Sequence, residues 1–331
     1  MIHIICHDFK STSGNHAGMR HLYQEFAKRI SKVNLFILND KGVGVKYCNR
    51  IISLFVAIKL VLIYRKGDKF IFTEDILKGS FQTWMISIVR LFYPKAPIYA
   101  MVHLTPSHLL RSFSKSELIK EAQKVTSIIT LGHSLTQFFN DIGVDNVYTS
   151  FHYLDTDYYN IENKTSNHPI RVIVMGAMAR DYRMLADVVR NTPNASFVIC
   201  KGRKDIDSLF YGLNNVTLLG YMSEDELKNQ MANADISLNV MEDTVGSNVI
   251  CTSLGMGLAM ICSDVGSIRD YCDDTNTIFC KTADDFSKSI NRLSRNKSLL
   301  MSMQQSAIKT SKRLSIENYI KDILTLIGEN E

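Results

Sequence analysis

Short runs of apolar residues alternate with longer segments of helical period along the whole chain. In the first half these runs are rich in β-branched and aromatic residues, and they cover Met1–Cys6, Val33–Leu38, Lys69–Thr73, Pro97–His103, Ser127–Leu131 and Val147–Phe151. Near-continuous apolarity is typical of parallel strands that are buried on both faces. Between the first two runs, Leu22, Phe26 and Ile30 recur four residues apart, which predicts a helix over Ala17–Ile30. The first half therefore has a βαβ rhythm.

The same rhythm begins again after residues 160–169, a polar stretch that ends in a proline. The later runs are Arg171–Met175, Ser196–Cys200, Val216–Leu219, Ile236–Val240, Ala259–Ser263 and Thr277–Cys280, and a last amphipathic segment covers Ile316–Ile327. We expect an α/β protein of two doubly wound, Rossmann-like domains that face a cleft. The first domain is predicted over residues 1–160 and the second over 161–315. A C-terminal helix over 316–331 could pack back on the first domain.

One segment, Ile51–Tyr64, is apolar except for Ser53 and Lys59, and Arg65 and Lys66 follow it. As a helix it would be about 21 Å long, which is short of the ~30 Å hydrocarbon core of a bilayer. Two interpretations stay open. The segment is either a buried core helix or a helix that docks on a membrane surface with its basic residues toward anionic lipid.

Composition narrows the class of protein. Of 331 residues, 46% are hydrophobic and 21% are charged, which excludes a disordered chain, a collagen-like fibre and a coiled coil. Seven cysteines without a C-x-x-C pair favour reduced thiols in a cytosolic chain over a disulfide or zinc framework. The N-terminal residues lack the basic region and cleavage site of a signal peptide.

Charge is divided unevenly between the two halves. Residues 1–165 carry 20 Lys+Arg and 13 Asp+Glu, a balance of +7, and residues 166–331 have a balance of −2. The two halves are therefore expected to bind different partners. Lys and Arg do not cluster with aromatic residues on one face, so a nucleic-acid partner is not expected.

Candidate binding residues lie in loops that follow strands, because ligands of open α/β sheets bind beyond the carboxyl ends of the strands. The first loop, Lys10–Gly18, contains Gly14 and is either an ordinary turn or a loop whose backbone amides approach an anion. His103 follows the strand Ile98–Val102. Its imidazole could bind a sugar hydroxyl or have a structural role.

A third loop opens the second domain. Gly176 directly follows a strand and would let a ligand approach the backbone closely, and Arg180 and Arg183 could bind phosphate oxygens. Ion pairs with Asp181 or Asp187 are the alternative role for these arginines.

A fourth loop, Met241–Asn248, precedes the predicted helix Val249–Gly257. Gly246, Ser247 and Asn248 would stand at the start of that helix, where free amide groups and a partial positive charge suit a diphosphate. A simple helix cap explains the Ser and Asn types but not the surrounding pattern.

That surrounding pattern, Gly246–Gly266, resembles the donor-binding block of the retaining GT-B glycosyltransferases (glycosyl transferases group 1). Further similarity lies in Val147–Tyr159, in the strand Val216–Gly220, and in the capping box of Ser223 and Glu226 that follows that strand. The resemblance implies a GT-B fold with the nucleotide in the second domain.

Two positions depart from the family pattern. The family's two glutamates fall at Thr244 and Thr252. In the family, the second glutamate binds the nucleotide ribose and the first contacts the donor sugar. Threonine can form hydrogen bonds but supplies no negative charge, and Glu242 and Asp243 lie beside the first position.

The resemblance implies an enzyme, a hexosyl-type glycosyltransferase that moves a sugar with retention from a nucleotide-sugar to a glycan or lipid-linked glycan. Arginine and backbone amides would neutralise the leaving diphosphate, so neither a metal nor another cofactor is expected. The expected setting is capsule or O-antigen synthesis in the cytoplasm, with peripheral membrane contact through Ile51–Tyr64. A nucleotide-sugar epimerase and a degenerate protein that binds nucleotide or a partner without turnover are the alternatives.

His103 is the candidate catalytic residue of this interpretation. The candidate nucleotide-sugar-binding residues are Gly14, Gly176, Arg180, Arg183, Tyr221, Asp243, Thr244, Gly246, Ser247, Asn248 and Thr252.

Overall fold

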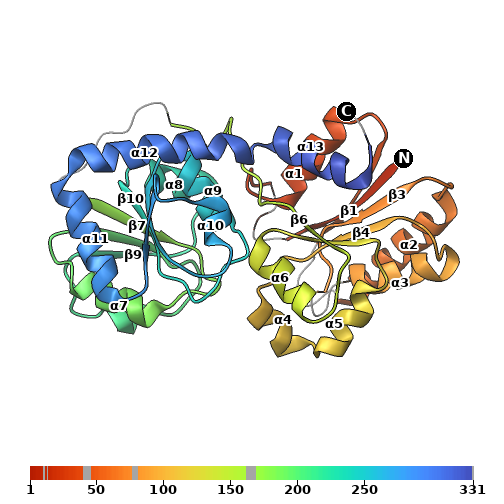
Figure 1. Cartoon of the computed structure of the whole chain (residues 1–331), viewed down its shortest axis with the longest axis horizontal. Coiled ribbons are helices and arrows are strands. Elements are labelled where there is room, and N and C mark those ends of the chain that lie inside the picture. The colour runs from red at the N-terminus through yellow and green to blue at the C-terminus, as the bar shows by residue number, and fades with distance from the viewer. Residues whose placement is uncertain (10–11, 13, 40–45, 77–80, 162–168, 330–331) are drawn as a thin grey trace. The chain divides into compact units, whose positions relative to one another are not determined.

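The computed structural model describes residues 1–9, 12, 14–39, 46–76, 81–161 and 169–329, with the backbone alone for residues 46–49. Three residues of the first predicted loop (10, 11 and 13) and most of the predicted linker (162–168) lie outside the described residues. Contacts divide the chain into two units (Figure 1). The first unit is Met1–Tyr153 with Ile316–Glu331, and the second unit is Leu154–Ser315.

The first unit has a parallel six-stranded sheet in the order β2-β1-β3-β4-β5-β6. Its strands are β1 (Ile2–Asp8), β2 (Val33–Asn39), β3 (Lys69–Phe72), β4 (Ile98–Met101), β5 (Ser127–Thr130) and β6 (Val147–Thr149). The chain moves from β1 to one neighbour, β2, and then returns to the other side of β1 for β3. The direction of winding therefore reverses between β1 and β3, which is where ligands of such sheets usually bind.

Helices cover the sheet of the first unit, and one of them comes from the far end of the sequence. The helices are α1 (Met19–Arg29), α2 (Lys46–Ile63), α3 (Gln82–Phe92), α4 (Pro106–Ser112), α5 (Lys115–Ala122), α6 (His133–Asp141) and α13 (Ile316–Ile327). Figure 1 shows the blue α13 beside the red α1. The buried hydroxyl groups of Tyr319 in α13 and Tyr23 in α1 lie 2.9 Å apart. Burying the apolar face of α13 therefore completes the core of the first unit.

The second unit repeats this architecture with a parallel sheet in the order β12-β11-β10-β7-β8-β9. Its strands are β7 (Arg171–Met175), β8 (Ser196–Cys200), β9 (Val216–Leu219), β10 (Ile236–Asn239), β11 (Ala259–Ser263) and β12 (Thr277–Cys280). The central strands β10 and β11 are buried on both faces, as expected for a parallel sheet between helices.

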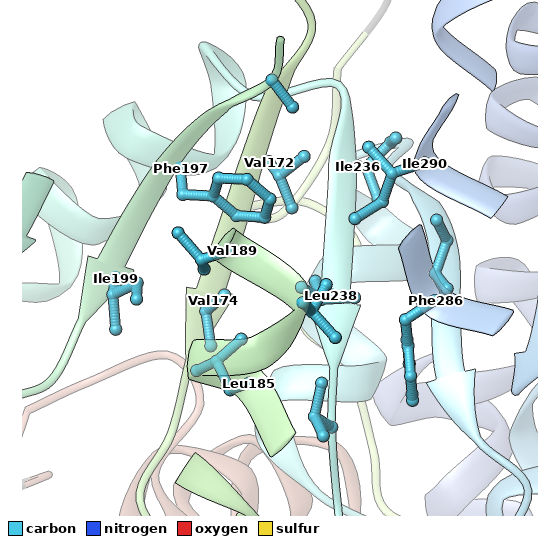
Figure 2. Close-up of a cluster of buried hydrophobic side chains, with 14 of the residues drawn as sticks. Val172, Val174, Leu185, Val189, Phe197, Ile199, Ile236, Leu238, Phe286 and Ile290 are labelled. Carbon is cyan, nitrogen blue, oxygen red and sulfur yellow. The ribbon is translucent and has the colours of Figure 1, made fainter. Parts of the chain in front are cut away.

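The helices of the second unit pack on both sides of its sheet. They are α7 (Tyr182–Arg190), α8 (Glu224–Ala232), α9 (Asn248–Gly255), α10 (Ile268–Tyr271), α11 (Ala283–Arg295) and α12 (Lys297–Ser311), with short 3₁₀ helices at Asp207–Phe210 and Lys312–Leu314. Figure 2 shows how Val172 and Val174 of β7 meet Leu185 and Val189 of α7 in the core of this unit. Phe286, from α11, packs into the same cluster.

The strands predicted from the apolar runs are confirmed in both units, within one or two residues at their ends. The capping box of Ser223 and Glu226 is also confirmed, because Ser223 Oγ accepts from the Glu226 amide while the Glu226 carboxylate accepts from the Ser223 amide. Such agreement is expected where burial and local hydrogen bonding favour the same structure.

The second unit begins earlier than the boundary predicted at residue 160. Leu154 donates its amide proton to the carbonyl oxygen of Leu314 at 2.7 Å, and Tyr159 donates its hydroxyl proton to Glu224 Oε1 at 2.6 Å. Both contacts lie within the second unit. The polar composition of residues 160–169 gave the prediction, whereas the contacts of Leu154 and Tyr159 determine the unit to which the residues before 160 belong.

Candidate functional site

The carboxyl ends of β7 and β10 form the point at which the sheet of the second unit reverses its winding. The two strands pair directly, but β7 leads to β8 on one side and β10 leads to β11 on the other. Backbone bonds join the loops that leave them. The Glu242 amide donates to the Ala179 carbonyl at 2.9 Å, and the Asp181 amide donates to the Val240 carbonyl at 3.2 Å. The predicted third and fourth loops are therefore one connected structure.

Gly176 is closely surrounded by other residues of this structure. Its φ is +80°, and a Cβ atom there would lie 3.0 Å from Val249 Cγ2 and 3.1 Å from Arg180 Nη2. Ala179 also has a positive φ, of 50°, although it is not a glycine. Backbone strain of this kind persists only where surrounding contacts hold it, and it is concentrated at functional sites.

Arg180 places a guanidinium group beside Gly176. Its Nη1 donates to Asn239 Oδ1 at 3.0 Å, and its Nε is buried with no hydrogen-bond partner among the described residues. Burial lowers the pKa of Arg180 to about 10, so the group stays cationic at neutral pH. A partly buried cation whose buried Nε donor has no acceptor among the described residues is suited to an anionic ligand.

The alternative of an ion pair for Arg180 is not what the structure shows. Asp181 instead caps α7 by accepting from the Met184 amide at 2.9 Å, and Asp187 pairs with Arg190.

The N-terminus of α9 lies against Gly176 through Val249. Ser247 is its N-cap and accepts from the Ile250 amide at 3.3 Å, and Gly246 before it has a φ of +105°. Asn248 is the first residue of the helix, and its buried Oδ1 has no partner among the described residues. The first-turn amides of a helix lack acceptors within the helix and favour negative charge.

The two threonines at the family's glutamate positions are buried and bonded locally. Thr252 Oγ1 donates to the Asn248 carbonyl oxygen at 2.7 Å, and Thr244 Oγ1 accepts from the Gly246 amide at 3.4 Å. Asp243 Oδ1 accepts from the Thr244 amide at 2.7 Å. Gly266 fixes this turn, because a Cβ there would lie 2.2 Å from the Thr244 carbonyl oxygen.

Two predicted residues lie farther out. Arg183 is exposed on the first turn of α7. Tyr221 follows β9, is 61% exposed, and has the Arg203 guanidinium 5.2 Å from its ring centroid. An aromatic ring and a cation at this distance attract each other and together form a surface on which a flat ring can stack.

His103 lies at the carboxyl edge of the first unit's sheet. Its Nε2 is 2.9 Å from the Thr73 carbonyl oxygen and 3.5 Å from a carboxylate oxygen of Glu74. Burial lowers the pKa of His103 to about 4 and raises that of Glu74 to about 8. His103 is therefore neutral at pH 7, and Nε2 carries the proton that it donates to Thr73.

Gly14 is also in the first unit, in an open loop with a φ of +85° and no atom near the position of a Cβ. The other ten candidate nucleotide-sugar-binding residues lie in the second unit. Among them, the structure brings Gly176, Arg180 and Asn248 to one place, at the start of α9. The predicted set is thus divided between two units.

Sequence reasoning missed three residues of these sites. Asn239 holds Arg180, Arg203 lies over Tyr221, and Glu74 lies beside His103. Asn239 and Glu74 both stand at the ends of buried strands, where a polar side chain could have been noticed. The pairing of Arg203 with Tyr221 depends on two loops that are distant in sequence.

Residues 169–296 match the model of the family described as Glycosyl transferases group 1. The matched residues lie within the second unit, and the match confirms for this part of the chain the resemblance found in its sequence. No curated protein matches the chain.

Solved structures show similarity over the whole chain. The HepE protein of Anabaena in complex with UDP and glucose is 12% identical with a TM-score of 0.74, and 99% of each chain is covered. Sucrose-phosphate synthase from Thermosynechococcus elongatus is 10% identical with a TM-score of 0.78 and 98% of each chain covered. The lipopolysaccharide outer core galactosyltransferase WaaB in its apo form is 13% identical with a TM-score of 0.70 and 99% of each chain covered. At these identities the similarity shows the fold, and the expected GT-B fold is confirmed.

Proposed function

We propose that the protein is a glycosyltransferase that moves a hexose from a nucleotide-sugar to a hydroxyl group of a glycan or lipid-linked glycan, with retention of configuration. The observation that carries this proposal is the partly buried Arg180, whose buried Nε has no hydrogen-bond partner among the described residues and lies at the switch point of a unit that matches glycosyl transferases group 1. Ligands of doubly wound sheets bind at such points.

The second unit would hold the donor through its diphosphate. Arg180 offers a cation, the start of α9 offers the amides of Asn248 and Val249, and Gly176 lets Val249 and Arg180 approach its backbone closely. HepE is described in complex with UDP and glucose, which supports a donor of this class. Tyr221 and Arg203 would offer a stacking surface to the nucleobase.

The same groups would favour the reaction itself. The bond from the anomeric carbon to the diphosphate oxygen breaks, the acceptor oxygen forms its bond on the same face, and the acceptor proton passes to the departing phosphate oxygen. Negative charge grows on the diphosphate in this step, and a fixed cation with helix amides stabilises it. These residues would supply the positive charge that stabilises the diphosphate without a metal ion.

The first unit would bind the acceptor. His103 of the same unit is neutral, because burial lowers its pKa to about 4, and it would bind the donor sugar or orient the reacting face as a hydrogen-bonding partner rather than as a cation. We place the protein in the cytoplasm at the inner face of the plasma membrane, in the synthesis of a surface polysaccharide such as capsule or O-antigen. The similarity to WaaB, described as a lipopolysaccharide galactosyltransferase, supports this setting.

A thermal-shift panel of UDP-, GDP-, ADP- and CMP-sugars tests the donor site. The true donor should raise the melting temperature, because it binds only the folded protein. Arg180→Ala should abolish that shift, whereas Asn248→Ala, which keeps the backbone amide and removes only the buried side-chain amide, should reduce it.

Arg292→Ala is the matched control, since Arg292 is exposed on α11 of the same unit and should leave the shift unchanged. Arg183→Ala separates the two arginines of the third loop. If Arg183→Ala abolishes the shift while Arg180→Ala keeps it, the diphosphate is not at Arg180 and the proposed geometry is wrong.

Binding without turnover is the second candidate function. Thr252 favours this candidate. Its hydroxyl group is uncharged and already donates to the Asn248 carbonyl oxygen in the same helix, so it cannot replace the carboxylate of the family's glutamate. A donor that raises the melting temperature but releases no free nucleotide with any lipid-linked acceptor would support this candidate. Isomerisation of the donor without an acceptor would instead indicate an epimerase.

A further inference from the structure

Helix α2 exposes several large apolar side chains to solvent. Ile51, Phe55, Ile58 and Leu62 are exposed, with Phe55 at 68% and Leu62 at 79%. Their spacing of four, three and four residues places them in one stripe about 16 Å long. A helix on the surface of a globular protein normally presents polar residues on this side.

The opposite side of α2 is already packed. Ser53, Ala57 and Leu60 are buried, and α2 contacts α3 and β2. The buried-core interpretation of Ile51–Tyr64 therefore holds for only one side of the helix. The exposed stripe is additional apolar surface that the first unit does not use for its own core.

The end of α3 extends this apolar surface. Leu91 is 77% exposed and Phe92 is 59% exposed. The next residue, Tyr93, donates its hydroxyl proton to the Val61 carbonyl oxygen at 2.7 Å, and its ring lies 4.3 Å from that of Tyr64. These contacts hold the C-terminal end of α3 against the C-terminal end of α2, and Figure 1 shows the two helices side by side.

The exposed charged residues on α2 and directly after its end are basic. Residues 41–116 contain twelve Lys or Arg and three Asp or Glu. The three acids are Asp68, Glu74 and Asp75, and all are buried. Lys59 stands on α2 itself, and Arg65 and Lys66 follow its end as exposed residues. The described charges that flank the stripe along α2 are thus cationic, whereas Lys69, farther along the chain, pairs with Glu329.

We infer that α2 and the end of α3 form a membrane-docking surface, on which α2 lies in the plane of an anionic bilayer. The stripe of Phe55, Ile58 and Leu62, with Leu91 and Phe92, would enter the boundary between headgroups and acyl chains. A helix in this position gains free energy from buried apolar area and from the attraction of its basic residues to anionic lipid.

The charge favours lipid over a second copy of the chain. Two copies that met through this surface would bring two cationic borders together, and like charges repel. The described residues contain no helix long and apolar enough to cross a membrane, so the surface would lie on the bilayer rather than span it. Docking does not depend on glycosyl transfer, and its test needs neither donor nor acceptor.

Flotation of the full chain with vesicles tests this inference. Vesicles of phosphatidylcholine with an equal amount of phosphatidylglycerol should bind the protein, and added salt should weaken the binding, because exposed charges are screened. Vesicles of phosphatidylcholine alone should bind it less. The double variant Phe55→Ser, Leu62→Ser should bind anionic vesicles about tenfold or more weakly. Arg65→Gln with Lys66→Gln should also weaken binding about tenfold or more.

The control is Tyr211→Ser, Met301→Ser, which removes two exposed large side chains from the second unit and should bind like the unaltered protein. Because all these side chains are exposed, none of the variants should change the melting temperature by more than a few degrees. Equal binding by the Phe55→Ser, Leu62→Ser variant and the unaltered protein would overturn the inference. A dimer in solution that this variant converts to a monomer would overturn it too, in favour of self-association.

Fluorescence gives a second measurement that locates the contact. The chain has a single tryptophan, Trp84. In a Trp84→Phe background, a Phe55→Trp reporter should shift to shorter wavelength with anionic vesicles, whereas a Tyr211→Trp reporter should not. A shift at position 211 without one at position 55 would contradict the docking of α2.

Discussion

Burial changes the charge of single residues at the sheet edge of the first unit. His103 and His152 both have pKa values lowered to about 4 by burial, and both line one small apolar pocket with Met101 and Phe151. Both imidazoles are therefore neutral at pH 7. In the second unit, burial lowers the pKa of Arg180 only to about 10, which leaves its charge in place. At neutral pH the two buried imidazoles are thus uncharged, whereas Arg180 remains a cation.

The lowered histidine pKa values predict a loss of stability in acid. Between pH 6.5 and about 4 the unfolded chain binds protons at His103 and His152, whereas the folded chain does not. Stability should therefore fall as the pH falls through this window, by at most about 1.4 kcal/mol per pH unit for each histidine. Urea unfolding at several pH values measures this slope.

The variants His103→Gln and His152→Gln should each reduce that slope. Glu74 acts in the opposite direction, because its pKa is raised to about 8 and the folded chain keeps its proton from about pH 4.5 upward. Glu74→Gln should therefore make stability fall less as the pH rises from about 4.5 to about 8. A histidine variant with the slope of the unaltered protein would show that the residue titrates normally.

The sequence predicts the positions of several site residues but neither their hydrogen-bond partners nor their pKa values. Gly176 and Arg180 were predicted because a strand precedes them, and the structure places them side by side. Their partners could not be predicted, because Asn239 reaches Arg180 from a strand about sixty residues away in the sequence. The pKa of Glu74 likewise depends on burial, which only the packed fold determines.

At the scale of elements, contacts between α1 and α13 join distant parts of the chain. Tyr23 and Tyr319 have fully buried hydroxyl groups 2.9 Å apart, and Tyr319 also has its hydroxyl 4.0 Å from Met101 Sδ. A buried hydroxyl group without a partner costs free energy, whereas the loss of both hydroxyl groups leaves an apolar contact.

A double-mutant cycle tests this pair of helices. Tyr319→Phe should lower the free energy of unfolding by about 1–3 kcal/mol, because it leaves the Tyr23 hydroxyl group without its partner. The double variant Tyr23→Phe, Tyr319→Phe should cost less than the sum of the two single variants. Additive costs in urea unfolding would show that the two hydroxyl groups do not interact.

Elements with a strong pattern were the easiest to predict. The parallel strands are continuous apolar runs, and α13 has its apolar residues on one side. The burial of these elements can therefore be predicted from the sequence pattern alone. The helix α2 gave an ambiguous pattern because it is apolar on both its packed and its exposed side. Periodicity alone cannot distinguish a buried helix from one that meets a membrane.

At the scale of the whole molecule, the second unit is inserted into the first. It enters at Leu154 and leaves at Ser315, and these two residues form a parallel bridge next to the bond between Leu154 and Leu314. Paired ends of this kind are typical of domains that can be separated from their hosts.

Residues 154–315 should therefore fold when expressed alone. The fragment should unfold cooperatively and show the same donor-dependent thermal shift as the full chain, since Gly176, Arg180 and Asn248 all lie within it. Residues 1–153 alone should be much less stable than the same residues joined by a short linker to 316–331, because they lack α13. A fragment 154–315 that folds but shows no shift would place part of the donor site in the first unit.

The insertion also sets an order of events on the ribosome. Residues 154–315 emerge before residues 316–331, so the inserted unit can reach its native state while its host still lacks the helix that closes its core. Until α13 has emerged, the apolar residues of α1 and of the neighbouring strands that α13 will cover remain exposed. A chaperone that binds exposed apolar surface on the nascent chain should therefore bind within residues 1–153. These residues are synthesised first, but their core is completed last.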